Sequence, residues 1–377
     1  MLISVIEKGA VLNVQGICYM RRKQNMEVEM SKLNNIFTVD SHVMGEPLRI
    51  VTGGISYLKG KSVKEKKEYF RDKFDHIRKA LILEPRGHDN MFGAILCEPT
   101  NPLADIGIFF IHSGGYLDMC GHGIIGAVTT IIELGIITKP YEKKVEVILE
   151  TPAGLIIAYA EIEEDKVVNV IFDNVPSFVL YKDYSLNLPQ IGTIIMDIAY
   201  GGNFFGIISA KELSLNINKN NFTKLLSYSM ELKGIINNKI NVFHPINKTN
   251  STIDLIEVYE EVESSSKHYH SFVAFGNGQV DRSPCGSGTS ALLAVQYAKN
   301  KICLNEDICN ESIIGTKFSG KLIKETKVGN FDAVIPRIKS RAFITGIHHF
   351  IIDSNDFLRN GLSLNEYALV NQISYAK

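Results

Sequence analysis

Residues 281–291 read DRSPCGSGTSA, and residues 119–123 repeat the core of this motif as MCGHG. In each stretch a cysteine stands directly before a Gly-x-Gly turn. An apolar run follows each turn, at 124–134 and at 290–298, and both runs predict buried helices. The sequence therefore predicts one local arrangement twice, a cysteine at the N-terminus of a buried helix.

A cysteine in this position is expected to be reactive. It faces backbone N–H groups without helical partners and the positive end of the helix dipole, which lower the thiol pKa and favour the thiolate. In the first half, an apolar strand at 106–111 leads through a glycine-bearing loop at 113–115 to Cys120. Such an order of strand, loop and helix suits a ligand site below the helix N-terminus. Cys120 and Cys285 are therefore the two candidate catalytic residues.

The composition limits the partners of the protein. The chain has 377 residues, of which 45% are hydrophobic and 21% are charged, as expected for a globular protein of two domains. Forty basic and 41 acidic residues leave a formal net charge of -1, which argues against binding to nucleic acid or to an anionic membrane. We therefore expect a small-molecule substrate, no nucleic-acid partner and no membrane association.

The cysteines and the N-terminus indicate the compartment. Six cysteines are scattered along the chain without a C-x-x-C pair or zinc-ligand spacing, which favours a reducing, cytoplasmic environment. The apolar residues 1–6 are followed by Glu7 and Lys8, so they are too short for a signal-peptide core or a membrane span. The globular pattern begins near Ile36, and we expect residues 1–34 to be a leader that is either disordered or upstream of the true start.

Many short strands and two central apolar helices indicate an α+β fold. The order of strand, glycine-bearing loop, cysteine and helix occurs in both halves of the chain. We therefore expect two pseudo-symmetric domains, each a mainly antiparallel sheet wrapped around a central helix, with the active site in the cleft between them. The first domain is predicted over residues 35–180 and 350–377, and the second over residues 181–349.

Other elements have clear local signals. Two strands joined by a loop are predicted between residues 36 and 55, and Ser62 with Glu65 forms a capping-box signature for a charged helix. His88 lies in the polar loop 84–93, where the residues alone indicate local turn chemistry.

Four interpretations of the two cysteines compete. Plain burial would need no glycines after each cysteine, and a redox dithiol would be expected in a C-x-x-C context. A Cys120–His122 nucleophile would leave the second cysteine unexplained. A Cys-Gly-His sequence lacks the further ligands of a metal site, so we expect no metal here, and the pair His348-His349 is expected on a strand surface for the same reason.

The fourth interpretation uses both cysteines. One thiolate removes a proton from a carbon, and the other thiol delivers a proton to the opposite face. Racemisation and epimerisation need two such groups on either side of one carbon. Two helix N-termini that face the same cleft would also bind a substrate carboxylate through backbone N–H groups and stabilise the charge that develops during deprotonation.

The two cysteine motifs resemble the signature motifs of proline racemases. The resemblance runs from about Val39 to about Asp353 and includes DSH at 40–42 with GE at 45–46, EPRGH at 84–88 and ITG at 344–346. It implies an isomerase, an amino-acid racemase or epimerase, that needs no cofactor. It also implies a diaminopimelate-epimerase-like fold and a homodimer.

The resemblance assigns roles to individual residues. Cys120 and Cys285 match the base and acid pair, and Asp281 matches the position that meets the ring nitrogen of the substrate. The remaining matching positions are assigned to substrate binding: Gly121, His122, Gly286 and Ser287 at the carboxylate, Phe92 and Phe275 in an apolar pocket, and His88 in the polar loop.

The substrate is expected to be proline. A ring hydroxyl would find no partner beside two phenylalanines, which disfavours the alternative, a 4-hydroxyproline 2-epimerase. In the related trans-3-hydroxyproline dehydratases the second cysteine is typically a threonine, whereas this chain keeps Cys285. The alternative outside enzymes is an inactive proline-binding or thiol-sensing module.

Overall fold

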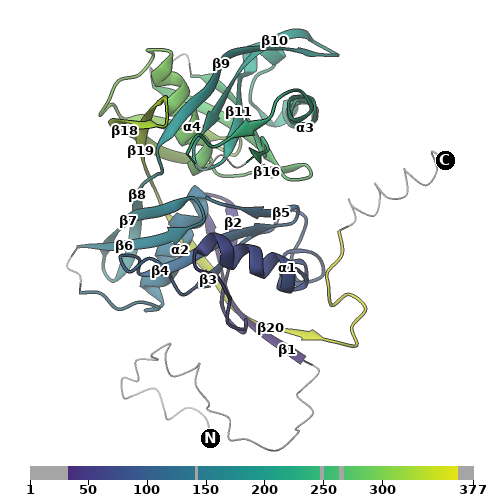
Figure 1. The fold of residues 1–377 in the computed structure, drawn as a ribbon, viewed down its shortest axis with the longest axis vertical. Coiled ribbons are helices and arrows are strands. Elements are labelled where there is room, and N and C mark those ends of the chain that lie inside the picture. Colours follow the sequence, from purple (N-terminus) through teal and green to yellow (C-terminus); the bar gives the residue numbers. More distant parts are fainter. Residues whose placement is uncertain (1–32, 141–142, 247–249, 263–266, 364–377) are drawn as a thin grey trace, which may run out of the picture.

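The computed structural model describes residues 33–140, 143–246, 250–262 and 267–363. Figure 1 shows two lobes that follow each other along the longest axis of the molecule. The lower lobe holds α1, α2 and the strands up to β8 together with β20, and the upper lobe holds α3, α4 and the strands from β9 to β19. This is the expected α+β architecture, rich in strands and with few helices.

The lower lobe is built mainly from strands. Its elements are β1 (Leu33–Val43), β2 (Glu46–Gly53), α1 (Val63–Ile82), β3 (Phe92–Cys97), β4 (Ile106–His112), β5 (Gly115–Leu117), α2 (Gly121–Glu133), β6 (Lys144–Thr151), β7 (Gly154–Glu163), β8 (Lys166–Asp173) and β20 (Ala342–Asp353).

The upper lobe has the same character and two additional 3₁₀ turns. Its elements are β9 (Ser177–Leu188), β10 (Gly192–Tyr200), β11 (Phe204–Ser209), η2 (Ala210–Leu213), η3 (Lys219–Asn221), α3 (Phe222–Lys239), β12 (Val242–Phe243), β13 (Asn250–Ser251), β14 (Leu255–Glu261), β15 (His268–Phe275), β16 (Gln279–Asp281), α4 (Gly286–Ala298), β17 (Ile308–Ser312), β18 (Lys317–Val328) and β19 (Phe331–Ser340).

One series of strand pairings occurs in both lobes. In the lower lobe β2 pairs in parallel with β3 across α1, β3 pairs antiparallel with β4, and β4 pairs antiparallel with β5 and in parallel with β6. In the upper lobe β11 pairs in parallel with β14 across α3, β14 pairs antiparallel with β15, and β15 pairs antiparallel with β16 and in parallel with β17. In each series the short strand β5 or β16 leads into a cysteine and its helix, and β6 or β17 follows that helix.

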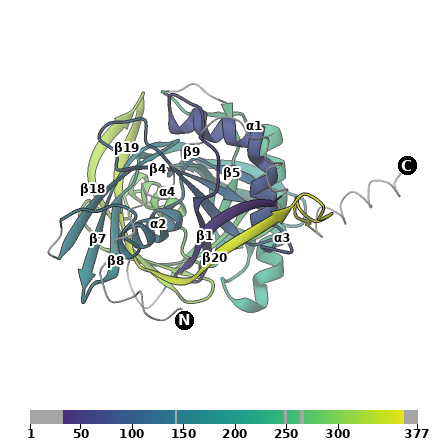
Figure 2. The same ribbon diagram turned by 90° about the horizontal axis from the view of Figure 1, so that it is seen from below.

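Helices α2 and α4 are enclosed by strands. Helix α2 packs against β1, β2, β7, β8 and β20, and α4 packs against β9, β10, β11, β18 and β19. Figure 2 shows both helices near the centre of the molecule, with α1 and α3 towards the outside. For this reason the two apolar runs are buried up to Ile131 in α2 and up to Gln296 in α4, as predicted from their sequences, and only the last residues of each run reach the surface.

The chain passes between the lobes twice. It leaves β8 through residues 174–176, and it returns at Arg341, between β19 and β20. The domain limits at residues 180 and 349 remain a prediction. The strand pairings place the two crossings between the lobes a few residues before these limits. All of β9 lies beside β10 or β19, and all of β20 pairs with β1.

The N-terminal strand begins before the expected point. Residues 1–32 of the predicted leader and 364–377 of the predicted first domain lie outside the described residues. Leu33 and Asn34, which the prediction placed in the leader, belong to β1 and pair with Asp353 and Ile352.

Helix α1 confirms the capping signal. Ser62 is the N-cap, and its hydroxyl accepts a hydrogen bond from the N–H of Glu65 at 3.1 Å. The carboxylate of Glu65 accepts from the N–H of Lys61 at 2.8 Å, one residue before the partner that a capping box would use. Among the described residues, no helix is long and apolar enough to cross a membrane.

Candidate active site

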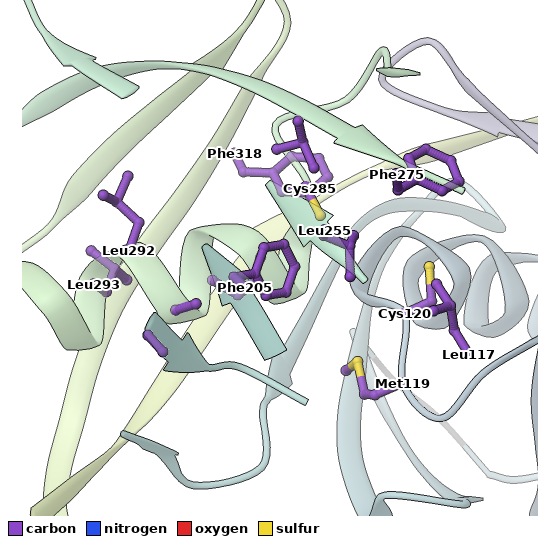
Figure 3. Close-up of a cluster of buried hydrophobic side chains, with 14 of the residues drawn as sticks. Leu117, Met119, Cys120, Phe205, Leu255, Phe275, Cys285, Leu292, Leu293 and Phe318 are labelled. Atoms are coloured by element: carbon purple, nitrogen blue, oxygen red, sulfur yellow. The ribbon is translucent and has the colours of Figure 1, made fainter. Parts of the chain in front are cut away.

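The N-termini of α2 and α4 are in direct backbone contact. A Cβ atom built on Gly121 would lie 2.4 Å from the Cα of Gly286, and one built on Gly286 would lie 2.6 Å from the Cα of Gly121. No side chain fits between the two helix ends, so glycine is required at both positions. Figure 3 shows the cysteines that precede these glycines, Cys120 and Cys285, within one buried cluster beside Phe275.

Cys120 is the N-cap residue of α2. Its backbone is extended, with a φ of -149°, and its Sγ accepts a hydrogen bond from the N–H of Gly123 at 3.2 Å. The Nδ1 atom of His122 lies 3.2 Å from the same sulfur. The thiol therefore takes the place of the serine or aspartate side chain that usually caps a helix.

Cys285 is the N-cap residue of α4, but its backbone differs. Its φ is +61°, a left-handed value that costs a residue with a side chain about 1–3 kcal/mol. The hydroxyl of Ser283 accepts from the N–H of Cys285 at 3.2 Å, and the N–H of Gly288 donates to Sγ at 3.4 Å. The hydroxyl of Ser287 lies 3.7 Å from the sulfur.

Burial controls the pKa of both thiols. Cys120 and Cys285 are each only 5% exposed, and this burial raises the pKa of both thiols well above the ordinary value. Hydrogen bonds from the helix N–H groups act in the opposite direction, but Asp281 opposes them as a nearby negative charge. The expectation of low thiol pKa values is therefore wrong for the protein without substrate, because desolvation outweighs the helix N-terminus.

Asp281 is close to neighbours of both thiols, namely Ser283 beside Cys285 and His122 beside Cys120. Its Oδ1 accepts from the N–H of Ser283 at 2.8 Å and from its hydroxyl at 2.7 Å, and its Oδ2 is 3.9 Å from Nδ1 of His122. Burial raises the pKa of Asp281 to about 6, although the bonds from Ser283 favour the carboxylate. Burial lowers the pKa of His122 to about 3, which leaves its imidazole neutral near pH 7.

Aromatic rings stand beside this centre. The ring of Phe92 contacts His122 edge-on, with 4.5 Å between the ring centroids. The ring centroid of Phe275 lies 6.3 Å from that of Phe92 and 5.7 Å from that of His112. The two predicted phenylalanines, one from each lobe, therefore form an apolar wall next to the first thiol.

Two buried carboxylates near the thiols were not predicted as site residues. The Oε2 of Glu46 accepts from the N–H of Arg282 at 2.8 Å, and burial, with Asp281 nearby, raises the pKa of Glu46 well above its usual value. Burial raises the pKa of Glu257 to about 8. The second oxygen of each carboxylate has no hydrogen-bond partner within the described part of the chain.

A sequence signal was available for one of these carboxylates. Glu257 interrupts the apolar run of β14, where a strand inside the fold would otherwise carry only apolar side chains. His112, at the end of the apolar strand β4, was missed for a similar reason; burial lowers the pKa of His112 to about 4, and its Nδ1 lies 3.1 Å from the Oε1 of Gln279.

The structure brings most of the predicted site residues to this one place. Gly121, His122, Gly286 and Ser287 form the first turns of the two helices, and all four are buried. The exception is His88, whose side chain is exposed in the loop after α1. Arg282 reaches the same loop by donating to the carbonyl of Asn90 at 3.2 Å.

Known proteins resemble this chain along most of its length. The model of the proline racemase family matches residues 38–363 of this chain. A proline racemase of Clostridioides difficile is 46% identical over 330 residues, which is 88% of this chain and 98% of the relative. A trans-3-hydroxy-L-proline dehydratase of Bacillus thuringiensis is 37% identical over 334 residues, 88% of this chain and 99% of the relative.

A solved structure gives the same result. A hydroxyproline epimerase of Agrobacterium vitis, with bound trans-4-OH-L-proline, superposes with a TM-score of 0.83 and 31% identity, covering 88% of this chain and 96% of the other. The repeated cysteine motif, the two enclosed helices and these similarities lead to one conclusion: the chain belongs to the proline racemase family and is an isomerase of the racemase and epimerase type.

Proposed function

We propose that the protein interconverts L- and D-proline by direct proton transfer at the α-carbon, with Cys120 and Cys285 as the two acid-base groups and with no cofactor. The observation that carries this proposal is the contact between Gly121 and Gly286, which brings two cysteine-capped helix N-termini to one point. One planar carbon between two thiols is the arrangement that inversion requires.

The helix ends supply the binding site for the substrate carboxylate. The first N–H groups of an α-helix have no partner within the helix, and here two such sets face each other. A carboxylate between them accepts hydrogen bonds from both helices and meets two positive dipole ends. The same groups stabilise the negative charge that moves onto the carboxylate when the α-proton leaves.

The proton transfer then follows from the thiol environments. The thiolate on one face takes the α-proton, and the thiol on the other face gives its own proton to the planar carbon, so that one thiolate and one thiol remain afterwards. A thiol whose pKa is raised by burial becomes a stronger base once ionised, which suits removal of a weakly acidic proton. In this proposal Asp281 pairs with the cationic ring nitrogen of the substrate. That cation offsets the negative charge of Asp281, which otherwise opposes ionisation of the thiols.

The pocket wall favours proline over its hydroxylated form. Phe92 and Phe275 offer a ring hydroxyl no hydrogen-bond partner, and an unpaired buried hydroxyl costs binding free energy. The relative from Clostridioides difficile is named a proline racemase, and that from Agrobacterium vitis a hydroxyproline epimerase. The second name keeps 4-hydroxyproline as the alternative substrate.

A substrate panel tests this proposal. The purified protein, without added cofactor, is incubated in deuterium oxide with each isomer of proline and of 4-hydroxyproline, and the products are separated on a chiral column. The expected result is interconversion of the proline enantiomers with deuterium at the α-carbon, and a lower kcat/KM for hydroxyproline. Faster turnover of 4-hydroxyproline would replace proline with the alternative substrate, and retention of the α-proton would refute the mechanism.

We also propose that the lobes are two pseudo-symmetric domains with the active site between them, and that the protein is a homodimer. Apolar side chains on the β1 and β20 surface are exposed, namely Phe37, Phe343, Ile347 and Ile351. Such a patch on paired strands suits an isologous contact between two copies of the chain. A monomer in sedimentation at micromolar concentration would contradict the dimer.

The cytoplasmic location stays part of the proposal. Both catalytic thiols must be reduced to transfer protons, which a reducing compartment ensures. All cysteines in the described residues are free. Recovery of the native protein from a secreted fraction would contradict this location.

A further inference from the structure

A second cluster of chemically reactive side chains lies on the sheet of the upper lobe. Strand β15 begins with the sequence His268-Tyr269-His270, and alternate residues of a strand point to the same face. Strand β17 runs parallel beside it, and Glu311 stands opposite His270 in the register. Two imidazoles and a carboxylate therefore share one face of two adjacent strands.

The ligand atoms of these three side chains converge. Nε2 of His268 lies 2.9 Å from Oε2 of Glu311, and Nε2 of His270 lies 3.5 Å from Oε1 of the same carboxylate. One ligand atom from each residue fits within a span of 4.8 Å. A tetrahedral zinc ion with bonds of about 2.0–2.2 Å needs ligand atoms about 3.3 Å apart, so only small side-chain adjustments are required.

A further carboxylate orients one of the imidazoles. Glu260 stands opposite His270 on the other neighbouring strand, β14, and its Oε1 lies 3.3 Å from Nδ1 of His270. A histidine that binds a metal through one ring nitrogen commonly donates the other N–H to a carboxylate, which fixes the ring and its tautomer. His270 has this arrangement, with Nε2 directed to the Glu311 side.

We propose that His268, His270 and Glu311 form a binding site for a divalent transition metal ion of the zinc type, with Glu260 as the carboxylate that orients His270. Two imidazoles and a carboxylate are a donor set that zinc accepts, and water supplies the fourth ligand. The three side chains are partly exposed, at 17%, 31% and 18%, so an ion can enter from solvent.

The charge of Lys317 is the main competitor of the ion. Its Nζ lies 3.3 Å from Oε2 of Glu311, and the lysine side chain is 56% exposed. Because it is exposed, Lys317 can turn away into solvent when an ion takes its place. Removal of this lysine is therefore expected to tighten metal binding by about fivefold or less, the value of one surface ion pair.

The matching place in the lower lobe has no such cluster. Glu150 occupies the position on β6 that Glu311 occupies on β17, and it stands opposite Gly107 where Glu311 stands opposite His270. The carboxylate of Glu150 accepts from the N–H groups of Thr100 and Asn101. The lower lobe thus uses the position of Glu150 to hold a loop, and in the described part of β4 the counterpart of His270 is Gly107.

Zinc titration of the full chain tests the site. The two active-site cysteines are first replaced, as Cys120→Ser with Cys285→Ser, because thiolates also bind zinc. Isothermal titration of this variant with ZnCl₂ should then give one ion per chain. Adding His268→Gln or Glu311→Gln should weaken binding by more than about 100-fold, and adding Glu260→Gln by about 10–100-fold.

A matched pair of histidines provides the control. His348 and His349 are neighbours on β20, so they point to opposite faces, and their replacement by glutamine should leave zinc binding unchanged. Equal binding before and after His268→Gln would overturn the proposal, and so would the absence of binding at micromolar zinc. Thermal unfolding of each variant without zinc shows whether a loss of binding is a loss of fold.

Discussion

Cys120 and Cys285 cap equivalent helices in two copies of one pairing series, yet their surroundings differ. Cys120 has an extended backbone and an imidazole beside its sulfur, whereas Cys285 has a left-handed backbone and a serine hydroxyl at longer range. The repeated frame places the thiols, and the non-repeated neighbours decide their chemistry. In the proposed reaction the two thiols exchange roles, which requires equal positions but not equal partners.

The largest expected effect comes from removing either thiol. Cys120→Ser or Cys285→Ser should lower the racemisation rate by about 10²–10⁴-fold, the usual contribution of one general acid or base. Each variant should still exchange the α-proton of one enantiomer with deuterium, because the remaining thiol returns a proton to the face it came from. The two variants should select opposite enantiomers, as mass spectrometry of the separated isomers would reveal; exchange in the same enantiomer would break the comparison.

The buried carboxylate behind the second thiol should govern stability against pH. Burial raises the pKa of Glu257 to about 8, above the value of about 4.3 in an unfolded chain. The contribution of the neutral carboxyl group to stability is fully present below about pH 4.3 and is lost as the pH rises through about 8. The free energy of unfolding of the parent protein should therefore fall by up to a few kcal/mol between about pH 5 and about pH 8.5. In Glu257→Gln this fall should be absent, as urea denaturation at the two pH values would measure.

Glu150 in the lower lobe is the control for this experiment. Burial tends to raise the pKa of Glu150, but hydrogen bonds from Thr100 and Asn101 outweigh it and lower the pKa. Its contribution to stability is therefore present at neutral pH and lost as the pH falls through its lowered pKa. Glu150→Gln should destabilise the protein at neutral pH, and equal pH slopes for both variants and the parent would contradict the assignment.

The glycine contact should tolerate no methyl group. In Gly121→Ala the new Cβ would lie 2.4 Å from backbone Cα of Gly286, which cannot rotate away as a side chain can. We expect a loss of about 1–3 kcal/mol in the free energy of unfolding together with a loss of activity. Gly234→Ala in α3, where nothing lies within 4 Å, should instead be neutral or stabilise by up to about 1 kcal/mol.

The smallest expected effect distinguishes the polar neighbours of the thiols. The Nδ1 atom of His122 lies 3.2 Å from Sγ of Cys120, and the hydroxyl of Ser287 lies 3.7 Å from Sγ of Cys285. His122→Gln should therefore lower kcat by about fivefold or more, the equivalent of one hydrogen bond of about 1 kcal/mol, and Ser287→Ala by less. Steady-state kinetics in both directions measures this, and a larger effect of Ser287→Ala would reverse the order of the two surroundings.

Local patterns in the sequence predicted much of the fold. The apolar runs after the two cysteines became α2 and α4, and the signal at Ser62 became the start of α1. The repeated layout was visible because each cysteine follows a strand and a glycine-bearing loop. These features depend on neighbours within a few residues, which a sequence displays directly.

Features that depend on packing between distant segments were not predictable. The raised pKa of each thiol results from burial by both lobes, while the sequence shows only the helix N-terminus that lowers it. Glu46 reaches Arg282 across 236 residues, and the loop position of Glu46 gave no sign of its full burial. The sequence showed Gly121 and Gly286 as turn residues, whereas their requirement comes from each other.

The contact between the two glycines also makes the two halves of the site depend on each other. Neither lobe alone presents both Cys120 and Cys285 or both helix N-termini. A substitution at one glycine changes the space available to the other, although 165 positions separate them in the sequence. The proposed reaction thus depends on a surface that both lobes build and on two positions that must both remain without side chains.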